Sequence, residues 1–399
     1  MTAPGLIFKS SLLRLNRRFI PNFGDLMRPR VKGTLVLILE RFMSGRLRGI
    51  ALLALVLTAA ALASAATPDQ LVDYGRFKQA RAVLEEQLRT HPNDAHIYWL
   101  LARVHRAFGD IQGGAALAQK AVQLDPKNAD YHLTYAELEG RIAQQSSMMK
   151  QLMLVRTIRK ELDTAAQLDP KNVDAQWGLL QFYWMAPSIA GGDKSKARAL
   201  AGEIAKLDQV QGYSAQAQFA ADDKNFAQAE QFYRKATEVD PKSYDARMNL
   251  AQFYMSPDMK KYDQAEEQFR AALKIDNGKI DPYTGLAIIC AQRGQWQKLD
   301  DLLTQSEQAI GDNLVPYFQA ARVLIEANSD LPRAERYLRK YTSQEPEGNA
   351  VSIGIAHWRL GQVLDRLGHR PEAIAEMNRA VQLSPGFDQA KKDLKKMGG

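Results

Sequence analysis

Six histidines and a single cysteine are the side chains best suited to metal binding or nucleophilic catalysis. The histidines are not spaced as zinc ligands, because the chain has no His-Glu-x-x-His pair and no two histidines lie four residues apart. Cys290 stands alone, which excludes a disulfide framework and a cysteine-based zinc site. A lone cysteine at an apolar position acts as a small hydrophobic residue. We therefore expect Cys290 in the core, no metal and no cofactor.

The glycine-rich stretch 190–195, Ala-Gly-Gly-Asp-Lys-Ser, invites comparison with a phosphate-binding loop. A P-loop needs the pattern G-x4-G-K-[ST] after a strand. Here Asp193 separates the glycine from the lysine, and its charge would repel phosphate. We expect a widened turn in which Asp193 caps the next helix. A long loop with an apolar tip is also a candidate contact site.

An internal sequence repeat indicates which structural elements would position these candidate residues. The eight residues 123–130 recur at 167–174 and, more loosely, at 238–245. Pro92 and Pro126 are separated by 34 residues, Pro126 and Pro170 by 44, and Pro170 and Pro241 by 71, which is close to two periods. A fixed period of this length is the signature of stacked structural repeats.

Small residues recur at fixed distances before these prolines. Before Pro126 they are Ala102, Gly114 and Ala121, and before Pro385 they are Gly361, Ala373 and Ala380. This pattern resembles the tetratricopeptide repeat (TPR) family, whose signature is W-x2-L-G-x2-Y, then A-x3-F, then Pro over 34 residues. The last repeat carries it as Leu360-Gly361-x2-Leu364, Ala373-x3-Met377, Ala380 and Pro385.

The resemblance implies an all-α, right-handed superhelical solenoid of about nine helix-turn-helix repeats with a C-terminal capping helix at 387–396. Proline would end each second helix, and Gly75, Gly109, Gly294 and Gly368 would allow positive φ in the turns. We place the repeats at 66–94, 95–128, 129–172, 173–209, 210–243, 244–279, 280–313, 314–348 and 354–387.

Three repeats depart from the pattern. The third has an insertion of about ten residues at 144–153 that is rich in methionine, and we expect these methionines to fill core. The fourth is widened at 185–194, and its stretch 182–192 resembles a decorated loop of some exported bacterial TPR proteins. The seventh lacks its proline and carries Gly311.

The TPR resemblance implies that the first helix of each repeat lines a concave groove. We call the groove-facing residues of these first helices the inner stripe. Four of the five tryptophans fall on it, and tryptophan and arginine are enriched in binding hot spots. The alternative is that these tryptophans pack between repeats. Some TPR proteins hold a C-terminal carboxylate with a set of lysine, asparagine and arginine side chains, and this sequence does not carry that set at the matching positions. The groove suits an extended peptide or an amphipathic helix, and less directly a glycan. The candidate partner-binding residues are Trp99, Arg103, Arg106, Trp177, Gln181, Trp184, Asn249, Gln252, Phe318, Arg322, Trp358, Arg359 and Gln362.

The net positive charge is confined to the N-terminal segment. The chain has a net charge of +8, and residues 1–65 carry ten basic and two acidic side chains, whereas the 43 basic and 43 acidic residues that follow cancel. The repeats therefore lack the broad basic surface of a nucleic-acid-binding protein, and we expect no nucleic acid.

Residues 43–65 have the layout of a secretory signal peptide. Arg46 and Arg48 precede an apolar stretch, and Ala63-Ser64-Ala65 is a small-x-small cleavage site. We expect cleavage near Ala65 and a periplasmic or secreted product. The alternative is an uncleaved inner-membrane anchor at 49–66, with the basic tail on the cytoplasmic side. We interpret residues 1–42 as a non-native upstream extension, or as the tail of that anchor, and residues 66–399 as the solenoid.

These features predict a non-enzymatic scaffold that binds a protein or peptide in the cell envelope. A membrane-anchored assembly factor and a polysaccharide-export accessory are the alternatives. An enzyme would need acidic side chains that converge in the groove, whereas the acids are dispersed over turns and outer faces.

Overall fold

A computed structural model describes residues 66–398, and every regular element in that part of the chain is a helix. The helices are α3 (Pro68–Asp73), α4 (Phe77–Thr90), α5 (Ala95–Ala107), α6 (Ile111–Leu124), α7 (Ala129–Gln144), α8 (Met148–Leu168), α9 (Val173–Met185), η1 (Ser188–Ala190), α10 (Lys194–Leu207), α11 (Gln209–Asp222), α12 (Phe226–Val239), α13 (Tyr244–Met255), α14 (Tyr262–Ile275), α15 (Ile280–Gln292), α16 (Trp296–Ala309), α17 (Val315–Glu326), α18 (Leu331–Tyr341), α19 (Ile353–Arg366), α20 (Arg370–Leu383) and α21 (Asp388–Lys396).

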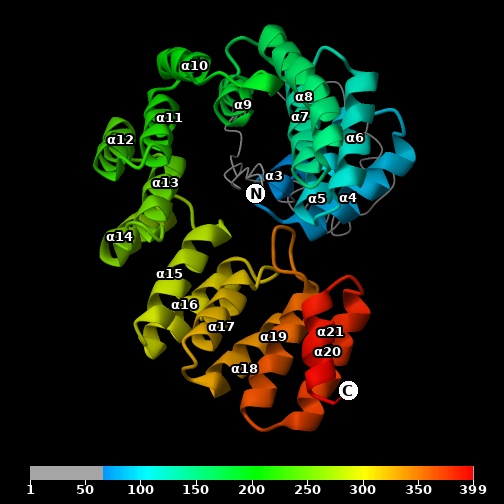
Figure 1. Cartoon of the computed structure of the whole chain (residues 1–399), viewed down its shortest axis with the longest axis vertical. Coiled ribbons are helices and arrows are strands. Elements are labelled where there is room, and N and C mark those ends of the chain that lie inside the picture. Colours follow the sequence, from blue (N-terminus) through cyan, green and yellow to red (C-terminus); the bar gives the residue numbers. More distant parts are fainter. Residues whose placement is uncertain (1–65, 399) are drawn as a thin grey trace, which may run out of the picture.

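The helices pack in consecutive pairs, and each pair packs on the next. An odd-numbered helix forms the first member of a pair and the following even-numbered helix the second, as in α5 with α6 and α19 with α20. Figure 1 shows the pairs following one curved path, with α11 and α13 on its inner side and α12 and α14 on its outer side. The predicted all-α solenoid is confirmed.

Local sequence signals explain where the helices begin and end. Gly109 and Gly368 lie in turns within pairs with φ values of 82° and 83°, which only glycine adopts without strain. Pro126 follows the end of α6 at Leu124, and the Asn128 side chain then accepts a hydrogen bond at the start of α7. Asp193 caps α10 through the backbone N–H groups of Ser195 and Lys196, as predicted.

The small residues of the repeat lie where helices approach closely. Ala102, Ala118 and Ala121 are fully buried. A Cβ atom on Gly361 would lie 2.9 Å from Cγ of Met377, which is closer than packed carbon atoms allow. A larger residue there would push α19 away from α20, so the fixed spacing of small residues sets the distance within each pair. Cys290 is 2% exposed, and its expected place in the core is confirmed.

The curve closes on itself. The N-terminal end of α4 contacts two loops that lie more than 230 residues further along the chain. The backbone N–H of Lys78 donates to Oε1 of Glu347 at 2.9 Å, and its Nζ donates to the carbonyl oxygen of Asp312 at 2.9 Å. The backbone N–H of Asn349 donates to the carbonyl oxygen of Ala107 at 2.6 Å. Figure 1 shows the loop between α18 and α19 reaching toward α4 and α5.

This closing contact is charged on its rim and tightly packed at its centre. Arg81 pairs with Glu345 at 3.2 Å, and Arg76 lies 3.8 Å from Asp312. A Cβ atom on Gly348 would lie 2.7 Å from a ring carbon of Phe77. Complementary charge and close packing therefore hold the first helices of the described chain against the loops before α17 and after α18.

The prediction that the methionines near α8 fill core is wrong. Met148, Met149 and Met153 are 70%, 74% and 72% exposed, and Leu152 is 42% exposed. Met149 and Met153 lie on the face of α8 opposite the buried Leu162, and α8 has 21 residues whereas the second helices α6 and α10 have 14.

The predicted signal or anchor and the interpretation of residues 1–42 fall outside the described residues. Within residues 66–398, no helix combines the length and the apolar character that a bilayer crossing requires.

Candidate functional site

The inner stripe predicted from the sequence combines buried aromatic side chains with half-buried polar ones. Trp99, Trp177 and Trp184, together with Phe318, are 3–9% exposed. The indole N–H of Trp99 donates to Oγ1 of Thr134 at 2.8 Å, and that of Trp184 donates to Asp222 at 2.7 Å. These bonds join one helix pair to the next. The burial favours the packing role for these four side chains, and their part in partner binding stays a prediction.

Trp358 differs from the other tryptophans of the stripe because it is only partly buried. Its indole N–H donates to Asp393 of α21 at 2.9 Å, and Phe387 packs edge-on against it at 5.0 Å. The guanidinium of Arg359 lies 4.5 Å from the centre of its ring. Trp358 thus presents an aromatic surface at the C-terminal end of the curve, where a cation already lies over it.

The polar residues of the stripe link successive first helices. Arg103 donates to Asp73 at 2.8 Å, and Arg106 donates to Glu137 at 2.5 Å. The Gln181 side-chain amide donates to that of Gln218 at 2.9 Å. Asn249 lies 3.5 Å from the hydroxyl of Ser214, whereas Gln252 is exposed.

Two groups of three arginines stand out on these helices. The first group consists of Arg103, Arg106 and Arg141. Burial lowers the pKa of Arg106, and the like charges of the other two lower it further, against the opposing effect of Glu137. With Asp73 and Glu137 as partners, two carboxylates face three guanidinium groups.

The second group, which we call the C-terminal arginine group, consists of Arg322, Arg359 and Arg366 on α17 and α19. Arg322 pairs with Glu326 at 3.0 Å, and Arg366 donates to the carbonyl oxygen of Ile325 at 2.9 Å. Burial lowers the pKa of Arg359, and the charges of Arg322 and Arg366 lower it further, against the opposing effect of Glu326.

The hydrogen-bond partners of Arg359 are neutral. It donates to Gln362 at 3.1 Å, and the amide of Gln362 lies 3.4 Å from Asp393. Guanidinium groups bind carboxylates and phosphates through two parallel hydrogen bonds. The C-terminal arginine group is therefore the part of the stripe with the largest capacity to accept an anionic side chain.

Arg141 and Arg366 were missed from the sequence. Each lies five residues after the small residue of its first helix, Ala136 or Gly361, and so faces the same side as the predicted stripe. The candidate list ended one residue short of that position, so the repeat register itself contained the signal.

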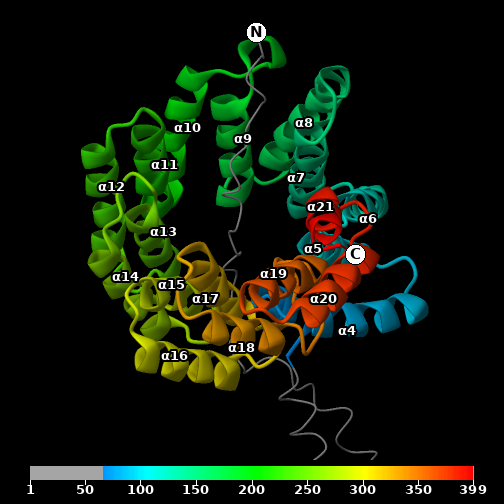
Figure 2. The same ribbon diagram turned by 60° about the horizontal axis from the view of Figure 1, so that its bottom comes forward.

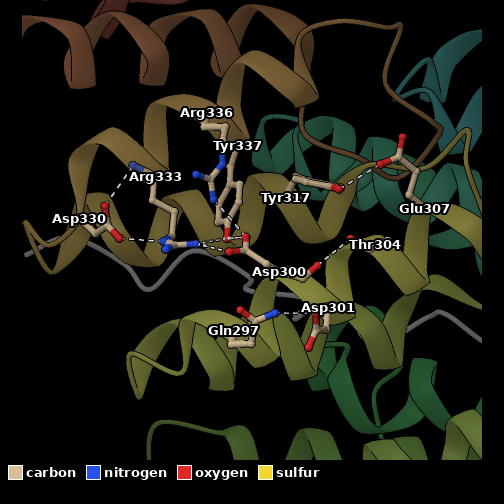
Figure 3. Close-up of polar contacts among 10 residues, drawn as sticks. All are labelled: Gln297, Asp300, Asp301, Thr304, Glu307, Tyr317, Asp330, Arg333, Arg336 and Tyr337. Atoms are coloured by element: carbon tan, nitrogen blue, oxygen red, sulfur yellow. Dashed lines mark hydrogen bonds and ion pairs between the residues drawn. The ribbon is translucent and has the colours of Figure 1, made fainter.

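A second polar cluster lies on the even-numbered helices α16 and α18 and is shown in Figure 3. Asp300 accepts hydrogen bonds from Arg333 at 2.5 Å and from the hydroxyl of Tyr337 at 2.6 Å. Burial raises the pKa of Asp300, but these two bonds and the charges of Arg333 and Arg336 together more than offset it, and the pKa lies below its ordinary value. An ionised carboxylate held in this way cross-links two helices.

The histidines have structural partners. The Nδ1 atom of buried His132 lies 2.5 Å from Glu161, and that of His357 lies 2.5 Å from Glu376. In each case the carboxylate comes from the second helix of the same pair. Over residues 66–398, histidine, cysteine, aspartate and glutamate form no group of three that could hold a metal ion.

Comparison with known proteins adds to this geometry. The family described as tetratricopeptide repeat matches residues 214–280 and 318–386, which include the helix pairs α13–α14 and α19–α20. The chain thus contains tetratricopeptide repeats over these residues. The family described as regulator of microtubule dynamics protein 1-3 matches residues 65–180 of this TPR chain. No curated protein matches it.

Solved structures similar to this TPR protein include yeast Tom70, with a TM-score of 0.44, 16% identity and coverage of 83% of this chain and 86% of the other. A thermophilic TPR protein of Thermus thermophilus, TTC0263, has a TM-score of 0.42 and 20% identity, with coverage of 47% and 96%. The APC/C hetero-tetramer Cut9-Hcn1 has a TM-score of 0.39 and 12% identity, with coverage of 80% and 58%.

Proposed function

We propose that this protein is a non-enzymatic scaffold that binds an acidic segment of another protein on the inner stripe of its TPR solenoid. The observation that carries the proposal is the C-terminal arginine group. Three guanidinium groups lie close enough there for Arg322 and Arg366 to affect the pKa of Arg359, and Arg322 pairs with Glu326. TPR proteins generally bind protein partners, which agrees with this choice of ligand class.

The neighbouring aromatic surface favours a peptide over a free anion. Trp358 lies beside Arg359, so a segment with an acidic and an apolar residue would contact both a guanidinium and an indole. The first helices of a solenoid form a continuous line, which suits an extended peptide or one face of an amphipathic helix.

The cell envelope is the proposed location, on the basis of the signal-like residues 43–65. A mature protein that begins near Ala65 would support export with cleavage. Retention of residues 49–66 in a membrane fraction would instead support the membrane-anchored assembly factor or polysaccharide-export accessory. N-terminal sequencing of the protein isolated from each fraction separates these alternatives.

The binding proposal is tested by site-specific photocrosslinking in intact cells. A photoreactive residue at position 358 should capture a distinct protein, and Arg359→Glu should remove most of that product, because charge reversal repels an acidic segment. Arg270→Glu is the matched control, since Arg270 lies on the second helix α14 and pairs with Glu266 on the same helix. An unchanged product in the Arg359→Glu variant would contradict the proposal.

A further inference from the structure

The start of α8 is an uncovered apolar tip. The second helices α6, α10 and α12 each have 14 residues, whereas α8 has 21, and its first two turns carry Met148, Met149, Leu152 and Met153 on the surface. Figure 2 shows the upper end of α8 standing above the neighbouring helices. Large apolar side chains on a projecting end mark a contact surface more often than scattered single ones do.

A second apolar tip lies on the same edge of the next helix pair. Ile189, in the connection between α9 and α10, is 88% exposed. That connection is ordered by its own backbone, because the N–H of Asp193 donates to the carbonyl oxygen of Tyr183 at 2.8 Å and Gly191 adopts a φ of 92°. In Figure 2 this connection and the start of α8 both lie at the upper edge.

Arg159 joins the middle of α8 to the end of α9. Its guanidinium donates to the hydroxyl of Tyr183 at 3.1 Å and lies 5.7 Å from the ring centre of Phe182. Both aromatic residues are in the last turn of α9, directly before the connection that carries Ile189. This contact fixes α8 against the end of α9. We call the exposed apolar side chains of the two tips the apolar edge: Met148, Met149, Leu152, Met153 and Ile189.

The charge around the apolar edge is positive. Residues 140–160 contain five basic side chains and no aspartate or glutamate. The acids nearest in sequence are engaged or partly buried: Glu161 contacts His132, Asp163 pairs with Arg159, and Glu139 is partly buried on α7 beside Lys150. Lys194 and Lys196 flank the second tip and are exposed, and the adjacent Asp193 caps α10 and lies 3.8 Å from Lys196.

We propose that the apolar edge docks on an anionic lipid bilayer. Insertion of a few large apolar side chains, with lysine and arginine at the level of the headgroups, is the pattern of interfacial membrane binding. The apolar edge has two separate tips, which a deformable bilayer accommodates without a matching rigid surface. Methionine adds flexible side chains that adapt to disordered acyl chains. This inference does not depend on the inner stripe or on residues 1–65.

The test is flotation of the purified protein, lacking residues 1–65, with lipid vesicles. We expect binding to phosphatidylcholine vesicles that contain phosphatidylglycerol, weaker binding to phosphatidylcholine alone, and a decrease when salt is raised. The variant Met148→Gln, Met149→Gln, Met153→Gln should bind the anionic vesicles about tenfold more weakly or worse.

Leu207→Gln with Val239→Gln is the matched control. These residues are 43% and 45% exposed but end the second helices α10 and α12, away from the apolar edge, so vesicle binding should not change. Equal loss in the control and the methionine variant would overturn the proposal, as would failure of the unmodified protein to float. Capture of a specific protein by a crosslinker at position 149, without flotation, would assign the edge to a protein partner instead.

Discussion

The helices α8 and α16 occupy equivalent places, as second helices of their pairs, yet their surfaces differ. In α16, Asp300 is bound to Arg333 and Tyr337 of α18, and Thr304 donates to the Asp300 carbonyl oxygen at 2.9 Å (Figure 3). In α8, the first two turns carry exposed methionine and leucine side chains.

The difference follows from length. The 14 residues of α16 fit the repeat, and its side chains find partners on the next pair. The 21 residues of α8 exceed the repeat, and the excess has no neighbouring helix of matching length. Side chains that fit the repeat stabilise the solenoid, whereas departures from it form surface that is free for other contacts.

The largest effect on stability is expected at Tyr337, whose hydroxyl donates to Asp300 and links α18 to α16. Tyr337→Ala removes a side chain that is 2% exposed together with its bond to Asp300, so we expect a loss of about 3–5 kcal/mol in the free energy of unfolding. Urea unfolding followed by circular dichroism measures it. Tyr337→Phe keeps the packing and should cost only about 1 kcal/mol. Similar losses for both variants would mean that packing contributes little there.

The closing contact should be the next most sensitive. Gly348→Val places side-chain atoms where Phe77 and Ala107 already lie within 2.8 Å of a Cβ position, and overpacking costs about 1–3 kcal/mol. Because both sides of the contact can separate without unfolding, we expect an open curve with a larger radius of gyration in small-angle X-ray scattering. Gly386→Val, at a glycine with no atom near its Cβ position, is the control and should leave the radius unchanged.

The closing contact also predicts a pH dependence. Burial raises the pKa of Glu347 above its ordinary value of 4.5, so the folded chain binds a proton there more tightly than the unfolded chain. Its contribution is therefore most favourable at low pH and is lost as pH rises through the raised pKa. Glu347→Gln keeps an oxygen that can accept the Lys78 N–H and should flatten this part of the stability profile. An unchanged profile would show that Glu347 is not the group responsible.

The smallest effect is expected at the apolar edge. Met149→Gln alters a side chain that is 74% exposed, so the free energy of unfolding should change by less than about 0.5 kcal/mol. Met377→Gln is the contrasting control, because Met377 is fully buried against α19 and should cost several-fold more. A large loss at position 149 would mean that the start of α8 is covered in solution.

The repeat made most of the fold predictable. Proline and glycine mark turns through their own backbone geometry, and small residues mark close helix contacts, so each signal acts within about one repeat. Gly109, Asp193 and Cys290 behave as these rules predict. The exposed methionines were misjudged because the same residue type fills cores and forms surfaces, and the face of α8 that each side chain occupies separates the two cases.

The inner stripe was predictable in its positions but not in its accessibility. Trp99 and Trp184 face neighbouring pairs, and whether a large ring is covered there depends on side chains of the next pair. The closing contact could not be predicted either. Lys78 and Glu347 are 269 residues apart, and no repeat pattern specifies how far the curve turns before the two meet.

The hydrogen bonds from Lys78 to Glu347 and from Asn349 to Ala107 connect helix pairs that are far apart in the sequence. A change in curvature anywhere between these pairs has to break the bonds or be compensated elsewhere along the chain. We therefore expect the helices from α4 to α18 to move as one coupled unit, whereas the neighbours in an open solenoid can bend independently.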